Sequence, residues 1–487
     1  MVHWQSGCAG MFPEGRVIFD LRAWLACVVM TLAGCAAVGP DYTEPEAPAP
    51  DAWEMTQDSG LKATPYELVE WWEVFNDPVL NQLVDIAHQQ NYSLELAGLR
   101  VLESRAQLGI AVGTQYPQQQ LASGGVTRIS PSENAGQGNT AFSQYDLGAS
   151  LAWEMDFWGK FRRGIESADA ALSASIANYD EAMVLVTAQV VSNYVTIRIL
   201  EEQLRIAYEN LKLQQRSYDI AEVLYRNGQD SELDVQQAKT LLLGTQATVP
   251  ELKTQLSLSQ NALNTLLGQI NGFVEDLIID GPIPDVPEQV AVGIPADLLR
   301  RRPDVRQAEL QAVAQNAQVG VATADLYPSI ALSGSLGVAS ISKDVGGGGS
   351  SSLFNSDSVS YTAGASFTWP VLNYGRIRNN IRVQDARLQQ AVVSYQQTAL
   401  EALQEVDDAM VSLAGAQAQK EILKQGVEAA KRSNDLSMLQ YKEGFSGYQR
   451  VLDAQKSLFS QQNRYATSQG QAVQSMVQLY KALGGGW

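Results

Sequence analysis

The sequence contains very little cysteine and histidine. Its 487 residues include three cysteines and two histidines. Two of these cysteines and one histidine fall within residues 1–34, which resemble a removable signal segment, so only Cys35 and His88 follow it. A single cysteine excludes an internal disulfide, and a single histidine excludes most metal sites and most histidine-based catalysis. No glycine motif that cradles phosphate precedes a helix, so we expect no enzyme, no metal and no cofactor.

Long apolar runs are also absent, and no stretch of the sequence suggests a membrane-spanning helix. The N-terminal apolar run, residues 23–32, is too short to cross a bilayer. It leads into Leu32-Ala33-Gly34-Cys35, the pattern of a bacterial lipoprotein processing site. We expect cleavage after residue 34, a diacylglyceryl group on the Cys35 thiol, and a lipidated extended segment over residues 35–70. The alternative is a buried helix that happens to end in cysteine.

Positively charged residues are outnumbered. The chain has 34 lysines and arginines against 53 aspartates and glutamates, which gives a formal net charge of −19. A protein of this sign repels the phosphate backbone, so we expect no nucleic-acid partner.

Proline is scarce where long helices would form. Residues 132–281 contain one proline, Pro250, and no proline follows Pro370. From residue 172 to residue 225, apolar residues recur at alternating steps of four and three, which is typical of a coiled-coil seam. We therefore expect a helix over residues 155–226 that is about 100 Å long. A compact enzyme has no use for such a helix, whereas a protein that crosses a periplasm does.

The chain repeats its own plan. Residues 153–179 match residues 369–395 at tryptophan, glycine, aspartate and tyrosine positions, and a second coiled-coil seam follows in the same phase. Tyr225-Arg226-Asn227-Gly228 likewise matches Tyr441-Lys442-Glu443-Gly444. Each copy is expected to run helix, strand, loop, strand, long helix, tight turn, helix. The expected boundaries are residues 71–270 for the first repeat, 271–293 for a linker and 294–483 for the second repeat.

Four segments show the alternation of half-buried strands. Residues 145–154 place Tyr145, Leu147 and Trp153 on one face and small or polar residues on the other, and residues 360–369 do the same. Their expected partners, residues 120–129 and 330–341, are rich in glycine and serine. An apolar face that ends in aromatic residues is typical of transmembrane barrel strands. The alternative is the edge of a soluble sandwich.

Four strands cannot close a membrane barrel, because the smallest known barrels have about eight. An open sheet edge is not tolerated in lipid. We therefore expect an oligomer in which several chains share one barrel. Three chains would supply twelve strands, and the internal repeat would give the assembly nearly sixfold symmetry.

Several motifs resemble those of the outer-membrane factors of tripartite efflux pumps, the TolC-like proteins, and especially their lipoprotein, NodT-like branch. The motifs are Gly39-Pro40-Asp41-Tyr42 and residues 71–78, 153–160, 294–304 and 482–487. The resemblance implies a mainly helical homotrimer with a small transmembrane β part. In it, a 12-stranded barrel with four strands per chain continues into a long coiled-coil helical barrel in the periplasm.

The same resemblance implies a function and partners. The protein would be a passive exit duct for small toxic compounds and drugs, anchored in the outer membrane by lipid with a large periplasmic portion. It would receive its cargo from a periplasmic membrane-fusion adaptor and an inner-membrane efflux pump.

The turns that follow the two long helices are the first candidate sites. They carry Asn227-Gly228 and Glu443-Gly444, with Gly447 just beyond. Glycine past a helix end is the ordinary C-cap, because it accepts a positive φ. The resemblance implies more, namely that Asn227, Gly228, Gly444 and Gly447 form the periplasmic tip where the adaptor docks.

The residues beyond the turns are candidates for a periplasmic gate. The resemblance makes Asp453 the main candidate and Asp234 its equivalent in the first copy, and three copies would form a ring of like charge. Arg450 could pair with Asp453 on one helix face or across chains. Tyr441 ends the second seam, where gating and seam packing are both open. For the two aspartates, a solvated or helix-capping role is the alternative.

Three consecutive arginines form one further motif. Arg300-Arg301-Arg302 precedes Pro303, and we expect these arginines to pair with local carboxylates rather than bind a ligand.

The chain could instead be the outer-membrane duct of a type I protein secretion system, which the sequence does not separate from efflux. A pore-less, lipid-anchored coiled-coil tether would explain the heptads but not the four amphipathic strands.

Overall fold

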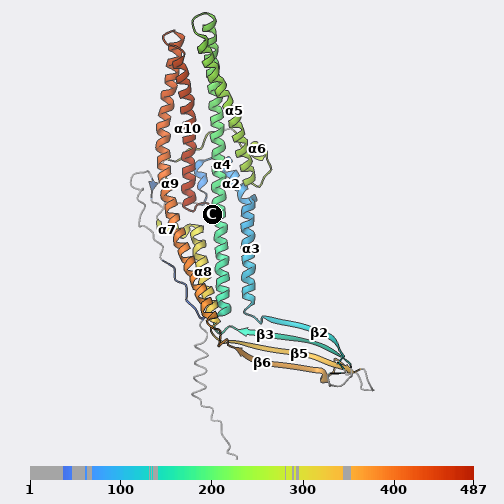
Figure 1. The fold of residues 1–487 in the computed structure, drawn as a ribbon. Coiled ribbons are helices and arrows are strands. Elements are labelled where there is room, and N and C mark those ends of the chain that lie inside the picture. The colour runs from blue at the N-terminus through green and yellow to red at the C-terminus, as the bar shows by residue number, and fades with distance from the viewer. Residues whose placement is uncertain are drawn as a thin grey trace, which may run out of the picture. The chain divides into compact units, whose positions relative to one another are not determined.

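The computed structural model describes residues 37–45, 61–62, 69–130, 132, 134, 141–279, 281–287, 290–291, 295–343 and 352–487. The chain is mainly helical and forms two compact units (Figure 1). The first unit comprises Met1–Asp41, Ile110–Glu166 and Asn316–Asp385. The second comprises Tyr42–Gly109, Ser167–Gln315 and Ala386–Trp487, so each unit contains segments from both halves of the sequence.

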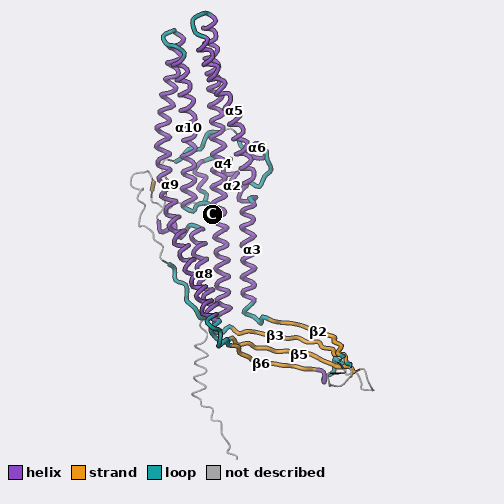
Figure 2. Tube along the Cα trace, in the orientation of Figure 1, coloured by secondary structure: helices purple, strands orange, loops and turns teal. Residues whose placement is uncertain are grey.

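The first unit contains a four-stranded antiparallel sheet (Figure 2). Its strands, in spatial order, are β2 (Gln119–Ile129), β3 (Phe142–Met155), β5 (Ser329–Lys343) and β6 (Val359–Thr368), and a 3-10 turn, η4 (Ser356–Ser358), precedes β6. All four expected strands are therefore confirmed, and β3 and β5 are longer than the sequence indicated. Strands β2 and β6 each have one edge that no other described strand of this chain pairs.

The register gives this sheet one apolar and one polar face. Tyr145 lies opposite both Val126 and Ser340, and Leu336 lies opposite Tyr361. Since side chains alternate along a strand, most large apolar residues of the four strands share one face, while Leu121, Ile129, Phe142 and Ile341 lie on the other. On the other face Ser335 and Thr362 are joined by a hydroxyl hydrogen bond of 2.7 Å.

Long helices make up most of the second unit. The chain forms α3 (Tyr92–Gly113), α4 (Lys160–Arg226) and α5 (Glu232–Leu266), then later α8 (Pro303–Ala324), α9 (Arg376–Lys442) and α10 (Gln449–Ala482). Helix α4 has 67 residues, and so does α9. At the rise of an α-helix, each is about 100 Å long, as expected. The element order of helix, strand, strand, long helix, turn and helix occurs twice (Figure 1).

Short elements connect the long ones. A 3-10 turn, η2 (Trp71–Phe75), precedes α2 (Pro78–Gln90). Helices α6 (Phe273–Leu277) and α7 (Pro295–Arg301) lie in the connection between α5 and α8, and β1 (Leu61–Lys62) pairs in parallel with β4 (Val290–Ala291). Asp77 caps α2 by accepting hydrogen bonds from the backbone amides of Val79 and Leu80, and it also accepts one from the Tyr194 hydroxyl of α4.

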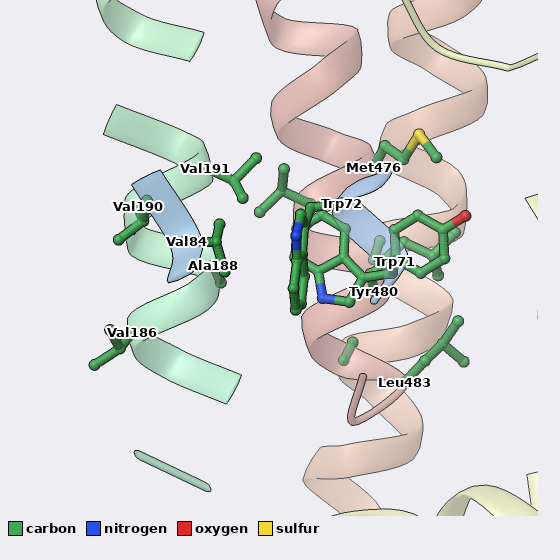
Figure 3. Packing of buried hydrophobic residues seen from close by; sticks show 14 of the residues in the cluster. Trp71, Trp72, Val84, Val186, Ala188, Val190, Val191, Met476, Tyr480 and Leu483 are labelled. Carbon is green, nitrogen blue, oxygen red and sulfur yellow. The ribbon is translucent and has the colours of Figure 1, made fainter. Parts of the chain in front are cut away.

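The main hydrophobic core lies where α2, α4, α9 and α10 meet. Trp71 is fully buried and stacks on Tyr480 with ring centroids 5.1 Å apart (Figure 3). Trp72 lies edge-on to His88, whose ring Nε2 contacts the Thr187 hydroxyl at 2.7 Å. His88 is thus part of the packing of this core.

The predicted seam of α4 is buried in its middle and exposed at its ends. Val190, Ile197 and Ala207 are buried, whereas Ile176 is 44% exposed and Tyr225 is 43% exposed. The heptad pattern therefore identified the correct helix face. Its exposed ends contain apolar residues that this chain alone does not cover.

Helix α4 also corrects the expectation that no stretch suggests a membrane span. It contains an 18-residue window with a mean hydropathy of 1.5 and few charges. That window is 61% buried within the chain, so its apolar character reflects core packing.

Of the three arginines before α8, only Arg302 forms the expected pairs with carboxylates among the described residues. Arg302 is buried, donates two hydrogen bonds to Asp304 and one to the Ala482 carbonyl, and forms an ion pair with Glu405 at 2.8 Å. It therefore joins the start of α8 to α9 and to the end of α10. Arg300 and Arg301 are exposed and form no ion pair within the described part of the chain.

Candidate functional site: the hairpin tip and the sheet

Both long helices end in the same kind of turn. After α4, Gly228 has φ +73° and donates its N–H to the Tyr225 carbonyl, while Gln229 donates to the Leu224 carbonyl. After α9, Gly444 has φ +76°, and the corresponding bonds run from Gly444 and Phe445. This is the glycine-ended helix cap that the sequence predicted at both turns. Asn227 and Gly447 flank these turns, and both are exposed.

The start of α5 gives Asp234 a capping role. Ser231 is the N-cap residue and accepts a hydrogen bond from the Asp234 backbone amide. The Ser231 hydroxyl donates to the Asp234 carboxylate at 2.7 Å. An acidic residue in the first turn also lies favourably in the field of the helix dipole. Asp234 thus lies in the first turn of α5 and bonds to the N-cap residue Ser231.

A small hydrophobic cluster joins the two hairpins next to their turns. We call it the tip cluster, and it consists of Ala221, Val235, Ala238, Tyr441, Tyr448, Val451 and Leu452. Tyr441 and Tyr448 lie edge to face with ring centroids 5.3 Å apart. Because burial raises the pKa of both tyrosines, to about 12 for Tyr448, both hydroxyls are neutral at physiological pH.

A hydrogen bond next to the turns also ties the second hairpin to the first. The Tyr441 hydroxyl donates to the Asp230 carboxylate, which lies in the turn between α4 and α5. Burial and the neighbouring Asp234 carboxylate raise the pKa of Asp230 above the usual range, and the bond from Tyr441 opposes this rise. Asp230 was not a candidate from the sequence. The repeat gave no signal for it, because its counterpart in the second copy is Ser446.

Asp453 and Arg450 do not form the ion pair considered for one helix face. Asp453 is exposed and accepts a hydrogen bond from Gln449 at 3.0 Å. Arg450 is exposed as well, and no ion pair involves it among the described residues. Residues three and four apart are both neighbours on a helix, and here the Asp453 carboxylate bonds to Gln449 at i−4 rather than to Arg450 at i−3. Both charges therefore face away from their own chain.

The sheet in the first unit is a second functional element, because it covers no core. Every residue of β6 is exposed, and so is all of β2 except one residue. Neither hydrophobic cluster of the described residues includes a residue from these strands. An apolar sheet face of this kind is stable only against lipid or another protein.

The segment after the expected lipid site is clasped within the first unit. Asp41 pairs with the buried guanidinium of Arg163 at 2.7 Å, and Arg163 also donates to the Val38 carbonyl. Gly39 has φ +101° and packs closely against Gly320, since a Cβ added to Gly39 would lie 2.5 Å from the Cα of Gly320. Cys35 itself lies outside the described residues, two positions before Ala37.

Comparison with known proteins identifies the family. The model of a family described as "Outer membrane efflux protein" matches residues 83–269 and 294–485. The chain belongs to this family. It is therefore an efflux channel of the outer membrane, which agrees with the exposed amphipathic sheet and confirms the resemblance found in the sequence.

Named relatives agree with this assignment. The chain is 31% identical over 480 residues to the "Probable outer membrane lipoprotein SilC" of Salmonella typhimurium, covering 96% of this chain and 100% of that protein. It is 32% identical to a "Toluene efflux pump outer membrane protein TtgI" of Pseudomonas putida, covering 94% and 97%. Among solved structures, the outer-membrane channel OprN matches with a TM-score of 0.86 and 31% identity, over 93% of this chain and 100% of that one. These relatives are channels rather than enzymes.

Proposed function

We propose that three copies of this chain form one continuous duct for small toxic compounds. The observation that carries the proposal is the four-stranded sheet with two unpaired edges, which has an apolar face and no core beneath it. In lipid, both edges must be paired. Three copies pair every edge and give a barrel of twelve strands, which is wide enough for a lumen lined by the polar face.

The helices support the same assembly. Helix α3 exposes a row of leucines at helical spacing, of which Leu96 is 50% exposed and Leu102 is 60% exposed. On a soluble surface such a row would be costly, and a neighbouring copy of the chain would cover it. A neighbouring copy of the chain would also cover the exposed apolar residues at the ends of the α4 seam. The helices would then enclose the periplasmic part of the duct.

Cysteine lipidation completes the membrane attachment in this proposal. SilC, whose whole length matches 96% of this chain, carries the word lipoprotein in its name. The clasp of Asp41 and Arg163 holds the chain from Val38 onward in the same unit as the sheet. Acyl chains on Cys35 would therefore enter the membrane that the strands cross.

The hairpin tip would act as both gate and docking site. Asn227, Gly228, Gly444 and Gly447 would meet a periplasmic adaptor that is bound to an inner-membrane pump. The Tyr441–Asp230 hydrogen bond would hold the two hairpins together in the closed state. Asp453 and Arg450, which face away from their own chain, would line the constriction beside Asp234 in a trimer. Relatives named for toluene and cation efflux make small toxic compounds the cargo class.

The two-part match of the family model supports an internal duplication. Its matched stretches, residues 83–269 and 294–485, correspond to repeats over 71–270 and 294–483 with a linker over 271–293 between them. Each copy would contribute two strands and one long hairpin. Three chains would then present six similar hairpins around the lumen.

Conductance in a planar bilayer tests this proposal. Purified full-length protein should produce discrete, stepwise currents, because a trimer encloses a water-filled lumen. A tether without a pore would produce no steps at any voltage. Absence of steps from protein whose β content is confirmed by circular dichroism would overturn the proposal.

A further inference from the structure

The long helices contain two separate hydrophobic clusters, with further buried apolar residues such as Leu204, Leu423 and Leu458 between them. The main core takes residues of α4 up to Ile197, residues of α9 up to Leu413 and residues of α10 from Val473 onward. The tip cluster begins again at Ala221 of α4 and ends at Leu452 of α10. No residue belongs to both clusters.

Buried amide side chains lie in the interval between the clusters, next to the tip cluster. We call them the amide layer, and it consists of Asn210 and Gln214 of α4, Asn434 of α9, and Gln455 of α10. Each is at most 6% exposed. Gln214 occupies a seam position of the α4 heptad, where an apolar residue is the rule.

The amide layer is only partly hydrogen-bonded. Asn210 donates to Gln462 at 2.7 Å, and Gln455 donates to the Ser217 hydroxyl at 2.6 Å. Gln214 lies between these two contacts on α4, and neither its Nε2 nor its Oε1 has a partner in the part of the chain that the structure describes. The same holds for the side-chain oxygens of Gln455 and Asn434. Amides left without partners disfavour the packing that buries them.

Helix α5 has its own weak point in the same interval. Pro250 lies between Leu241, which packs on the tip cluster, and Leu256, which packs on the main core. Proline has no N–H to donate to the carbonyl four residues earlier, so the helix ladder is interrupted there. The interval therefore combines buried apolar residues with amide atoms on α4, α9 and α10 that have no partner among the described residues, and with an interrupted backbone ladder in α5.

We propose that this interval is a joint at which the tip ends of α9 and α10 shift relative to α4 while the main core stays in place. The inference rests on the proposed gate at the hairpin tip and says how that gate moves. In the closed packing, both polar atoms of the Gln214 amide and the Oε1 atom of Gln455 have no partner among the described residues, and a shift of α9 and α10 along α4 would hydrate or pair them. The layer thus lowers the free-energy difference between closed and shifted packing while the main core stays intact.

Replacing Gln214 and Gln455 together by leucine tests the joint. Leucine fits a buried seam position, so the double variant should fold and unfold at a higher temperature. Its open probability in a planar bilayer should fall by about tenfold, which corresponds to about 1.4 kcal/mol. The matched control replaces Leu204 and Leu458 by methionine, which keeps volume and polarity in the same helices and should leave the open probability nearly unchanged.

Two further measurements separate this inference from the proposed gate. Hydrogen exchange should be faster over residues 206–217 than over residues 186–197 in the wild type, and it should slow in the leucine variant. Tyr441→Phe, recorded in the same bilayers, reports on the gate itself. If Tyr441→Phe raises the open probability while the leucine pair leaves it unchanged, the joint is refuted and the gate stands. If Tyr441→Phe leaves the open probability unchanged, the proposed gate is refuted. Equal rates of hydrogen exchange over residues 206–217 and 186–197 would then refute the joint as well.

Discussion

Replacing Arg302 by methionine should destabilise the protein by about 3 kcal/mol. The guanidinium is buried, and it satisfies Asp304, Glu405 and the last carbonyl of α10 at once. Without it, Asp304 stays partly buried with no counter-charge, and the carbonyl loses its donor. Glu405 is half exposed, and solvent screens its loss, so the lower end of the range for buried pairs applies.

Thermal unfolding in detergent measures this effect. The matched control is Arg301→Met, which removes an exposed arginine from the neighbouring position. We expect a clear fall in the unfolding midpoint for Arg302→Met and almost none for Arg301→Met. Equal midpoints for the two variants would show that the buried ion pairs do not hold α8, α9 and α10 together.

Replacing Tyr441 by phenylalanine should open the duct. The phenylalanine ring keeps the packing of the tip cluster, but Asp230 loses the hydroxyl that joins the two hairpins. A hydrogen bond to a carboxylate contributes about 1.5 kcal/mol or more, so the open state should gain about tenfold in population. In a planar bilayer this appears as more frequent or longer openings.

Tyr225→Phe is the matched control for Tyr441→Phe. Tyr225 occupies the equivalent place at the end of α4, but its side chain is 43% exposed and no hydrogen bond of its hydroxyl occurs among the described residues. Its variant should conduct like the wild type. If both variants behave alike, the Tyr441–Asp230 bond is not the lock of the closed state.

Much of the fold could be predicted because its patterns are local. The heptad steps from residue 172 to residue 225 identified the face of α4 that is buried between Val186 and Ala221. The glycines at 228 and 444 marked both turns, because a positive φ is required there. Alternation within each strand was enough to find the sheet, since side chains on a strand take turns between its faces.

The contacts that the sequence did not reveal join distant segments. Nothing local indicates that Asp41 meets Arg163 or that Tyr441 meets Asp230. Arg450 and Gln449 are both helix neighbours of Asp453, so spacing alone did not reveal that Gln449 is its partner. In the sequence, the α4 seam has two polar exceptions, Asn193 and Gln214, of which only Gln214 belongs to the amide layer. Its meaning depends on burial, which the sequence pattern does not give.

Disulfide cross-linking between edge strands tests the shared barrel most directly. Cysteines at Ser123 of β2 and at Gly364 of β6, with Thr362 and Ser366 as alternative positions on β6, would be oxidised in membranes. As a control, cysteines at Ser150 and Ser335 face each other within one chain and should form no bond between chains. We expect covalent dimers and trimers, with no larger species, for at least one β2–β6 pair. Only monomers at every register, from protein that is inserted in the membrane, would contradict a barrel built by three chains.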